Sequence, residues 1–263
     1  MLFRSVGLVV TMIVLFDEQE EQMHKDSNAE QPPSLSNEYP PGISYTPCAD
    51  YATAVQQSTD YVCYREDIYS WLLMNADILS CPRCAVFRAM NYVDRVLSVV
   101  KVCPSMLEGL SWMCFYLAGS IGGLRKQKLS YNVVRLFFHD VYHYSNSEVL
   151  DFMQRILQIL GCRLLTPCPY SLCFEALKEC HHLELYSKAI LFIDSVSKRY
   201  ASISLSASAI VTGVLQVLSQ MQFHDLSLLD LFVPPAAVDE HAVRLCVDCI
   251  LGTDLQLNSG QHP

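Results

Sequence analysis

The stretch AVFRAMNYVDRVLS (residues 85–98) is apolar at nearly every turn, yet Asp94 and Arg95 stand in its middle. Apolar residues at this spacing predict a helix that is packed on most of its sides. A carboxylate buried in such a helix needs a partner, because an unpaired buried charge is very costly. The alternative is that Asp94 lies at an exposed edge of the helix.

The same helical period continues through most of the chain, and no segment alternates with period two for long enough to predict a sheet. Glycine and proline are sparse after the first fifty residues, which also favours helices. The fold class predicted from these patterns is all-α. The expected helices lie near residues 47–60, 64–77, 82–98, 103–120, 128–142, 146–160, 168–181, 184–200, 204–221, 224–232 and 236–251.

The two halves of the helical region resemble each other. RAMNYVDRVL (88–97) and KAILFIDSVS (188–197) match in character position by position, with Asp94 and Asp194 separated by 194 − 94 = 100 residues. The helices that follow keep this offset. A repeat of this length exceeds the usual solenoid unit and indicates a duplicated helical domain.

The first 46 residues differ from the rest. Residues 1–16 form an apolar leader that is shorter than the roughly 20 residues needed to cross a membrane, so we expect no membrane partner. The leader could instead be a signal peptide, although no small-residue cleavage site follows it. Residues 17–46 are acidic, rich in Pro and Ser and poor in aliphatic residues, which predicts disorder.

Composition and motifs argue against several function classes. The net charge is −9 and no part of the chain is basic, so we expect no nucleic-acid partner. The pairs CPRC (81–84) and CVDC (246–249) fall in different halves, which argues against a zinc site, and the twelve cysteines suggest a reducing compartment. No phosphate loop or poised nucleophile is present. We therefore predict a non-enzyme with no catalytic residues, metal, cofactor or small-molecule substrate.

Several segments resemble the cyclin family. AMNYVDRVLS (89–98) is very close to the second helix of an N-terminal cyclin box, and YREDIYSWLLM (64–74) resembles the first, with Arg65 and Trp71 in register. LTPCPYSLCFEAL (165–177) is similar to the junction into a second box, and DEHAVRLCVDCIL (239–251) to the last helix of D-type cyclins. Among cyclins, the chain looks closest to the D-type and virus-encoded members. The resemblance implies an N-terminal helix and two tandem five-helix boxes, at 47–165 and 166–257.

The resemblance also assigns a partner to the buried acid. In the family, an arginine of helix one pairs with the aspartate of helix two, which implies a structural ion pair between Arg65 and Asp94. We expect Arg95, by contrast, to point to solvent.

The family binds its kinase through a lysine in helix three and a glutamate in helix five. Alignment puts Ser120 and Met153 at these positions, so both charges are absent. The remaining kinase-facing positions are apolar, namely Ile121, Leu157 and Leu164, although Leu164 is better explained as core. Apolar anchors can support an interface that lacks charges at its rim.

The substrate-docking patch of the family maps to Tyr64, Asp67, Ile68 and Trp71. Asp67 replaces an aliphatic residue, and a carboxylate in an apolar groove should weaken docking of peptides. Trp71 could belong to the core instead.

These features imply a regulatory subunit of a cyclin-dependent protein kinase that promotes cell-cycle progression in the nucleus and cytoplasm, whether cellular or virus-encoded. The alternative is a cyclin-fold adaptor that activates no kinase and acts in a transcription-associated complex. Loss of the two charges favours the adaptor, whereas the D-type-like helices favour the kinase regulator.

Overall fold

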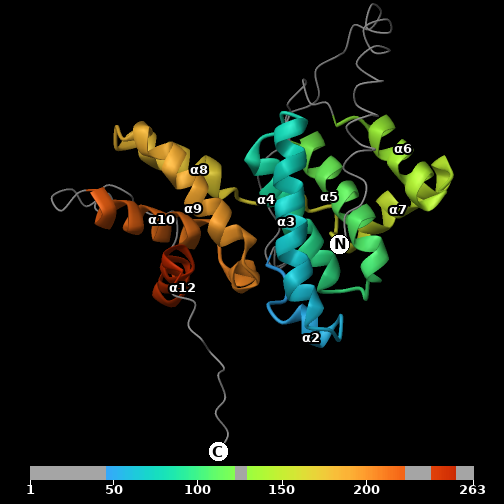
Figure 1. Ribbon diagram of the computed structural model, residues 1–263, viewed down its shortest axis with the longest axis horizontal. Helices are drawn as coiled ribbons and strands as arrows, with labels where there is room; N and C mark the ends of the chain where they lie inside the picture. Colours follow the sequence, from blue (N-terminus) through green and yellow to red (C-terminus); the bar gives the residue numbers. More distant parts are fainter. Residues whose placement is uncertain (1–45, 122–128, 223–237, 253–263) are drawn as a thin grey trace, which may run out of the picture.

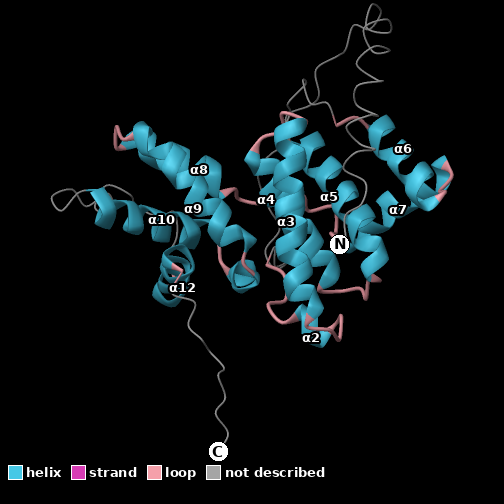
Figure 2. Cartoon of the chain, viewed as in Figure 1, coloured by secondary structure: helices cyan, strands magenta, loops and turns pink. Residues whose placement is uncertain are grey.

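The computed structural model describes residues 46–121, 129–222 and 238–252. Within these ranges every regular element is a helix (Figure 2), so the all-α prediction is confirmed. The apolar leader, the segment up to residue 45 and the helix predicted at 224–232 lie outside the described residues.

Figure 1 shows the helices in two groups along the long axis. In the first group, α3 and α4 lie beside α5, with α6 and α7 on the outer side. Its elements are α2 (Tyr51–Ala54), α3 (Asp60–Ile78), α4 (Arg83–Leu97), the 3-10 turn η1 (Pro104–Met106), α5 (Leu107–Ile121), α6 (Tyr131–Tyr142) and α7 (Asn146–Ile159).

Helix α4, which contains the opening stretch, is the centre of this group. It contacts α3, α5 and α7, and it also contacts α8 of the second group. Ten of its residues are buried, Asp94 among them, and this enclosure agrees with the helix predicted from the apolar pattern.

Among the described residues, the second group contains four longer helices around a separate cluster of buried side chains. Helices α10 and α12 approach each other closely at Gly213, where an added Cβ would lie 2.7 Å from the Sγ of Cys246. Helices α10 and α12 can therefore pack tightly because this position has no side chain. The elements are α8 (Pro169–Glu179), η2 (Leu183–Leu185), α9 (Tyr186–Lys198), η3 (Tyr200–Ser204), α10 (Ala207–Gln222) and α12 (Glu240–Leu251).

The two clusters meet along α4. Cys84 and Phe87 of α4 pack against the second cluster, and Ile203 of η3 belongs to the first. The exact box boundaries at 47–165 and 166–257 stay a prediction.

The first expected helix, at 47–60, is wrong in extent, because α2 covers only Tyr51–Ala54 and α3 begins at Asp60. After α2 the side chain of Gln56 turns inward and donates to the backbone oxygens of Leu97 and Val100, at 2.6 and 2.8 Å. Gln57 then takes a positive φ of 59°, which ends the helical path. A polar side chain that binds a distant backbone has thus overridden the local periodicity.

Candidate functional site

The buried acid of α4 has the partner that the resemblance implies. The guanidinium of Arg65, from α3, donates from Nη2 to Oδ2 of Asp94 at 3.0 Å and from Nε to Oδ1 at 3.1 Å. Tyr51 of α2 donates its hydroxyl to the same carboxylate at 3.0 Å. Three helices therefore converge on one carboxylate, and the alternative of an exposed Asp94 is excluded because its exposure is 2%.

Arg65 also binds the second helix group, which the sequence did not predict. Its Nη1 donates to three backbone oxygens at the C-terminal end of α9, those of Ser197, Lys198 and Arg199, at 2.7 to 3.0 Å. The last carbonyls of a helix lack partners within the helix and carry partial negative charge, so a cation is favourable there. Arg65 is thus both the counter-ion of Asp94 and the C-terminal cap of α9.

Burial and pairing oppose each other in this cluster. Burial raises the pKa of the Asp94 carboxyl, while the charge and hydrogen bonds of Arg65 and the hydroxyl of Tyr51 work against that rise. Burial acts to lower the pKa of Arg65, but Asp94 more than offsets this effect and the pKa is raised. The ionised pair is therefore held by contacts that a single substitution would remove.

The expectation that Arg95 points to solvent is wrong. Its exposure is 8%, and it donates to the backbone oxygens of Arg163 and Leu160 at 2.7 and 2.8 Å. These oxygens belong to the segment that follows α7. Arg95 therefore supplies hydrogen-bond donors to backbone oxygens at the C-terminal end of α7, as Arg65 does at the end of α9. Charge alone suggested a solvent-facing residue, but a guanidinium can enter a core when backbone acceptors surround it.

The duplicated aspartate is also used, with different partners. Asp194 of α9 accepts hydrogen bonds from the hydroxyls of Tyr170, in its own half, and of Tyr69 in α3. Arg83 of α4 lies 3.8 Å from its second oxygen. Both repeated acids therefore receive donors from the first group of helices.

Of the five positions aligned with kinase contacts, one is exposed and four are half-buried. Ser120 is exposed near the end of α5, and its hydroxyl donates to the backbone oxygen of Tyr116 at 2.8 Å. Ile121, the last residue of α5, is half-buried. Met153 and Leu157 lie one turn apart on α7 and are also half-buried, with their inner parts against the first cluster. Leu164 packs against the same cluster, as its explanation as core anticipates.

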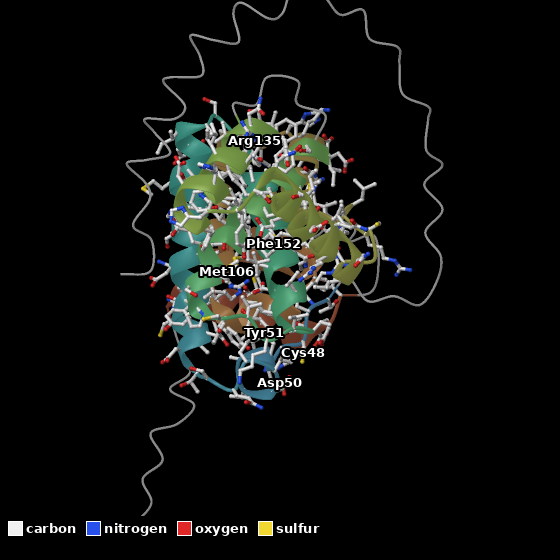
Figure 3. The ribbon with its side chains drawn as sticks, turned by 90° about the vertical axis from the view of Figure 1, so that its right-hand side faces the viewer. Cys48, Asp50, Tyr51, Met106, Arg135 and Phe152 are labelled. Carbon is white, nitrogen blue, oxygen red and sulfur yellow. The ribbon has the colours of Figure 1, made fainter. Side chains whose placement is uncertain are left out.

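One further residue of this surface escaped the sequence reasoning. Leu150 is 41% exposed and stands three and seven residues before Met153 and Leu157, so all three share one flank of α7. We call Leu150, Met153 and Leu157 the α7 flank. The signal in the sequence was that Leu150 is apolar but lies outside the apolar face that an amphipathic α7 buries. Figure 3 faces this side of the molecule and shows Phe152 near its middle, between Arg135 and Tyr51.

The docking patch that was aligned on α3 is only partly at the surface. Asp67 is exposed and Tyr64 is half-buried, whereas Ile68 is fully buried and Trp71 is 4% exposed. The Trp71 ring packs edge-on against Trp112 with centroids 5.1 Å apart. Trp71 therefore belongs to the core, and Tyr64 and Asp67 are the two members that a peptide could contact.

In the described parts of the chain, no cluster of three or more His, Cys, Asp or Glu side chains could hold a metal ion. No helix within those same ranges is both long and apolar enough to cross a bilayer.

Comparisons with known proteins agree with this architecture. Residues 42–165 match the family described as the cyclin N-terminal domain. No curated protein sequence matched the chain. Solved structures that match include the X-ray structure of a viral cyclin from herpesvirus saimiri, at 17% identity and a TM-score of 0.56, covering 72% of this chain and 85% of that chain. That likeness shows a shared fold, and the matched segment shows that the chain contains a cyclin N-terminal domain, which is found in regulatory rather than catalytic proteins.

Proposed function

We propose that this chain is a regulatory subunit of a cyclin-dependent protein kinase and promotes cell-cycle progression in the nucleus and cytoplasm. The observation that carries the proposal is the α7 flank. Leu150, Met153 and Leu157 present a continuous apolar strip on a helix whose other outward residues, such as Gln154 and Gln158, are polar and exposed. Met153 and Leu157 are also positions that the family resemblance assigns to kinase contact.

The strip supports binding through apolar anchors. The half-buried side chains of Met153 and Leu157 are held against the core, so they lose little rotamer entropy when a partner covers them. Apolar groups at the centre of an interface contribute most of its binding energy, and polar contacts at its rim contribute less.

Ser120 supplies the argument for the second candidate, an adaptor in a transcription-associated complex. Its hydroxyl is engaged by Tyr116 of its own helix, and Met153 has no charge, so neither residue replaces the charged contacts of the family. Two charge-assisted hydrogen bonds of about 1.5–3 kcal/mol each are missing. An adaptor has no need for either contact.

Titration of the purified full chain against a panel of cell-cycle kinases, with kinase activity as a second readout, tests the proposal. The kinase regulator should bind at least one kinase and raise its activity. Leu157→Arg places a charge within the α7 flank and should weaken binding at least tenfold. Gln158→Arg adds the same side chain on the solvent side of the helix and is the matched control.

Restoring the missing charges separates the two candidates. With Ser120→Lys and Met153→Glu combined, a kinase regulator should gain about 1–3 kcal/mol, because at these two positions, unlike position 157, the family resemblance places charged contacts with the kinase. For an adaptor the same changes should produce no binding, since two polar contacts cannot offset the roughly 4–15 kcal/mol cost of association. Absence of binding by the wild type and by the double variant would refute the kinase proposal.

A further inference from the structure

Two cysteines from different helix groups meet where α4 and α8 begin. Cys84 is the second residue of α4, and Cys168 is the N-cap residue of α8. The Sγ of Cys84 lies 3.3 Å from the hydroxyl of Ser171, in the first turn of α8. Ser171 stands three residues after Cys168, one helical turn away, so the contact of Cys84 falls at the end of α8 that Cys168 begins. The side chains of Cys84 and Cys168 are hydrogen-bond partners there.

The two thiols differ in acidity. The pKa of Cys84 is lowered to about 6, first by a hydrogen bond from the Cys168 side chain and, against the effect of burial, by Ser171 and the charge of Arg88. The pKa of Cys168 is raised, chiefly because its thiol donates this hydrogen bond. A lowered pKa favours the thiolate form of Cys84 beside the thiol of Cys168, and this is the arrangement that thiol oxidation requires.

The neighbouring cysteines lack this arrangement. Burial raises the pKa of Cys81 to about 11 and that of Cys173 to about 12. The CPRC motif is thus chemically asymmetric, because the thiol at residue 81 is less acidic than an ordinary cysteine and the thiol at residue 84 is more acidic.

We propose that Cys84 and Cys168 are a peroxide-sensitive pair that closes to a disulfide between α4 and α8. The Cys84 thiolate attacks one oxygen of hydrogen peroxide, an S–O bond forms, and the O–O bond breaks with release of hydroxide, which takes up a proton. The Cys168 sulfur then attacks the Cys84 sulfenic acid, and water leaves with the thiol proton. Two thiols and one peroxide give one disulfide and two water molecules.

The disulfide would join the two helix groups covalently. Helix α4 belongs to the first cluster and α8 to the second, and the bond would close a loop of 168 − 84 = 84 residues. Cys84 is half-buried and reachable by a small oxidant, whereas Cys168 is 4% exposed and protected from bulkier reagents. The product should resist separation of the groups, with a rise in the unfolding midpoint on the order of 5–10 °C.

Peptide mapping of the full chain tests the proposal. The protein is treated with a few equivalents of hydrogen peroxide, blocked with N-ethylmaleimide, digested without reductant and analysed by mass spectrometry. We expect a cross-linked peptide that contains Cys84 and Cys168, is two hydrogen atoms lighter than its parts and separates on reduction. Cys84→Ser should abolish the cross-link, and Cys81→Ser, the matched control in the same motif, should leave it.

Two outcomes of the mapping would overturn the proposal. One is a cross-link of Cys84 to Cys81 in place of Cys168. The other is recovery of both Cys84 and Cys168 alkylated while exposed thiols such as Cys63 are oxidised.

A measurement on the unoxidised wild type needs no variant. The rate at which iodoacetamide labels Cys84 should reach half of its maximum near pH 6. A midpoint above pH 8 would show an ordinary thiol and would remove the basis of the first step.

Discussion

Removal of either member of the Arg65–Asp94 pair should destabilise the fold far more than a surface substitution. The two side chains are 4% and 2% exposed and share hydrogen bonds of 3.0 to 3.2 Å. Breaking a buried pair from one side costs about 3–5 kcal/mol, because the other charge is left without its counter-ion. Asp94→Ala leaves a guanidinium that cannot lose its proton, although three carbonyl oxygens still surround it.

Arg65→Ala should lie at the upper end of this range. It removes the counter-ion of Asp94 and also the donor for three carbonyl oxygens at the end of α9. The Asp94 carboxyl can relieve part of the cost by taking up a proton, and water can reach some of the carbonyls. The two single variants thus test different consequences of one contact.

The assay is urea unfolding at pH 7 of the wild type, Arg65→Ala, Asp94→Ala and the double variant. The double variant leaves no isolated charge, so we expect a coupling energy of about 2–4 kcal/mol. The exposed pair of Lys178 and Glu175, 3.7 Å apart on α8, is the control and should couple by less than about 1 kcal/mol. Additivity of the Arg65 and Asp94 effects within about 0.5 kcal/mol would refute the reasoning.

Two further predictions concern pH and packing. In Arg65→Ala, Asp94 loses the main group that opposes the rise of its pKa. The folded state then binds the carboxyl proton more tightly than the unfolded chain does. The stability of this variant should therefore be greatest at low pH and should fall as pH rises through the pKa of Asp94 in the folded state. Urea midpoints between pH 4 and 8 check this against the double variant, which lacks the carboxyl and should show no such slope. Gly213→Ala should cost about 1–3 kcal/mol, because its Cβ would lie 2.7 Å from the Sγ of Cys246; a thermal unfolding midpoint equal to that of wild type would contradict it.

The opening stretch was sufficient to predict the central helix because its information is local and strong. Fifteen residues with an apolar period define α4, and the cost of an unpaired carboxylate demands a partner for Asp94. The arginine that supplies the partner was found through family resemblance, since nothing in the sequence itself links residue 65 to residue 94. The expected helix at 47–60 failed because Gln56 binds backbone oxygens about forty residues away, which a local pattern cannot reveal.

The predictions of surface residues were limited in the same way, because local sequence does not show how helices pack. Alignment can say that Met153 and Leu157 stand at family contact positions, but exposure depends on how α7 packs against its neighbours. Leu150 was missed for that reason, and Ile68 was assigned to a docking patch although it is fully buried. For Arg95 the error came from reading a charge as a surface signal, whereas its acceptors are carbonyl oxygens at the end of another helix.

The repeated aspartates explain why the two helix groups dock as they do. The repeat predicted from the sequence places an aspartate at matching positions of the two groups. In the first group Asp94 binds Arg65, and the remaining donors of that guanidinium reach the C-terminal end of α9, the helix that carries Asp194. In the second group Asp194 takes its donors from Tyr69 and Arg83 of the first group as well as from Tyr170 of its own group.

The first group therefore supplies donors to both acids, and α3 provides one residue to each, Arg65 and Tyr69. These residues stand four apart and so lie on the same face of α3. One face of α3 thus supplies the partner of the buried acid in its own group and binds the second group through hydrogen bonds. These bonds require a defined geometry, whereas apolar packing alone would tolerate sliding. Substitution of Tyr69 by Phe should accordingly loosen the contact between the groups while leaving the Arg65–Asp94 pair intact. Hydrogen exchange that increases in α9 but not in α4 would support this, and equal increases in both helices would contradict it.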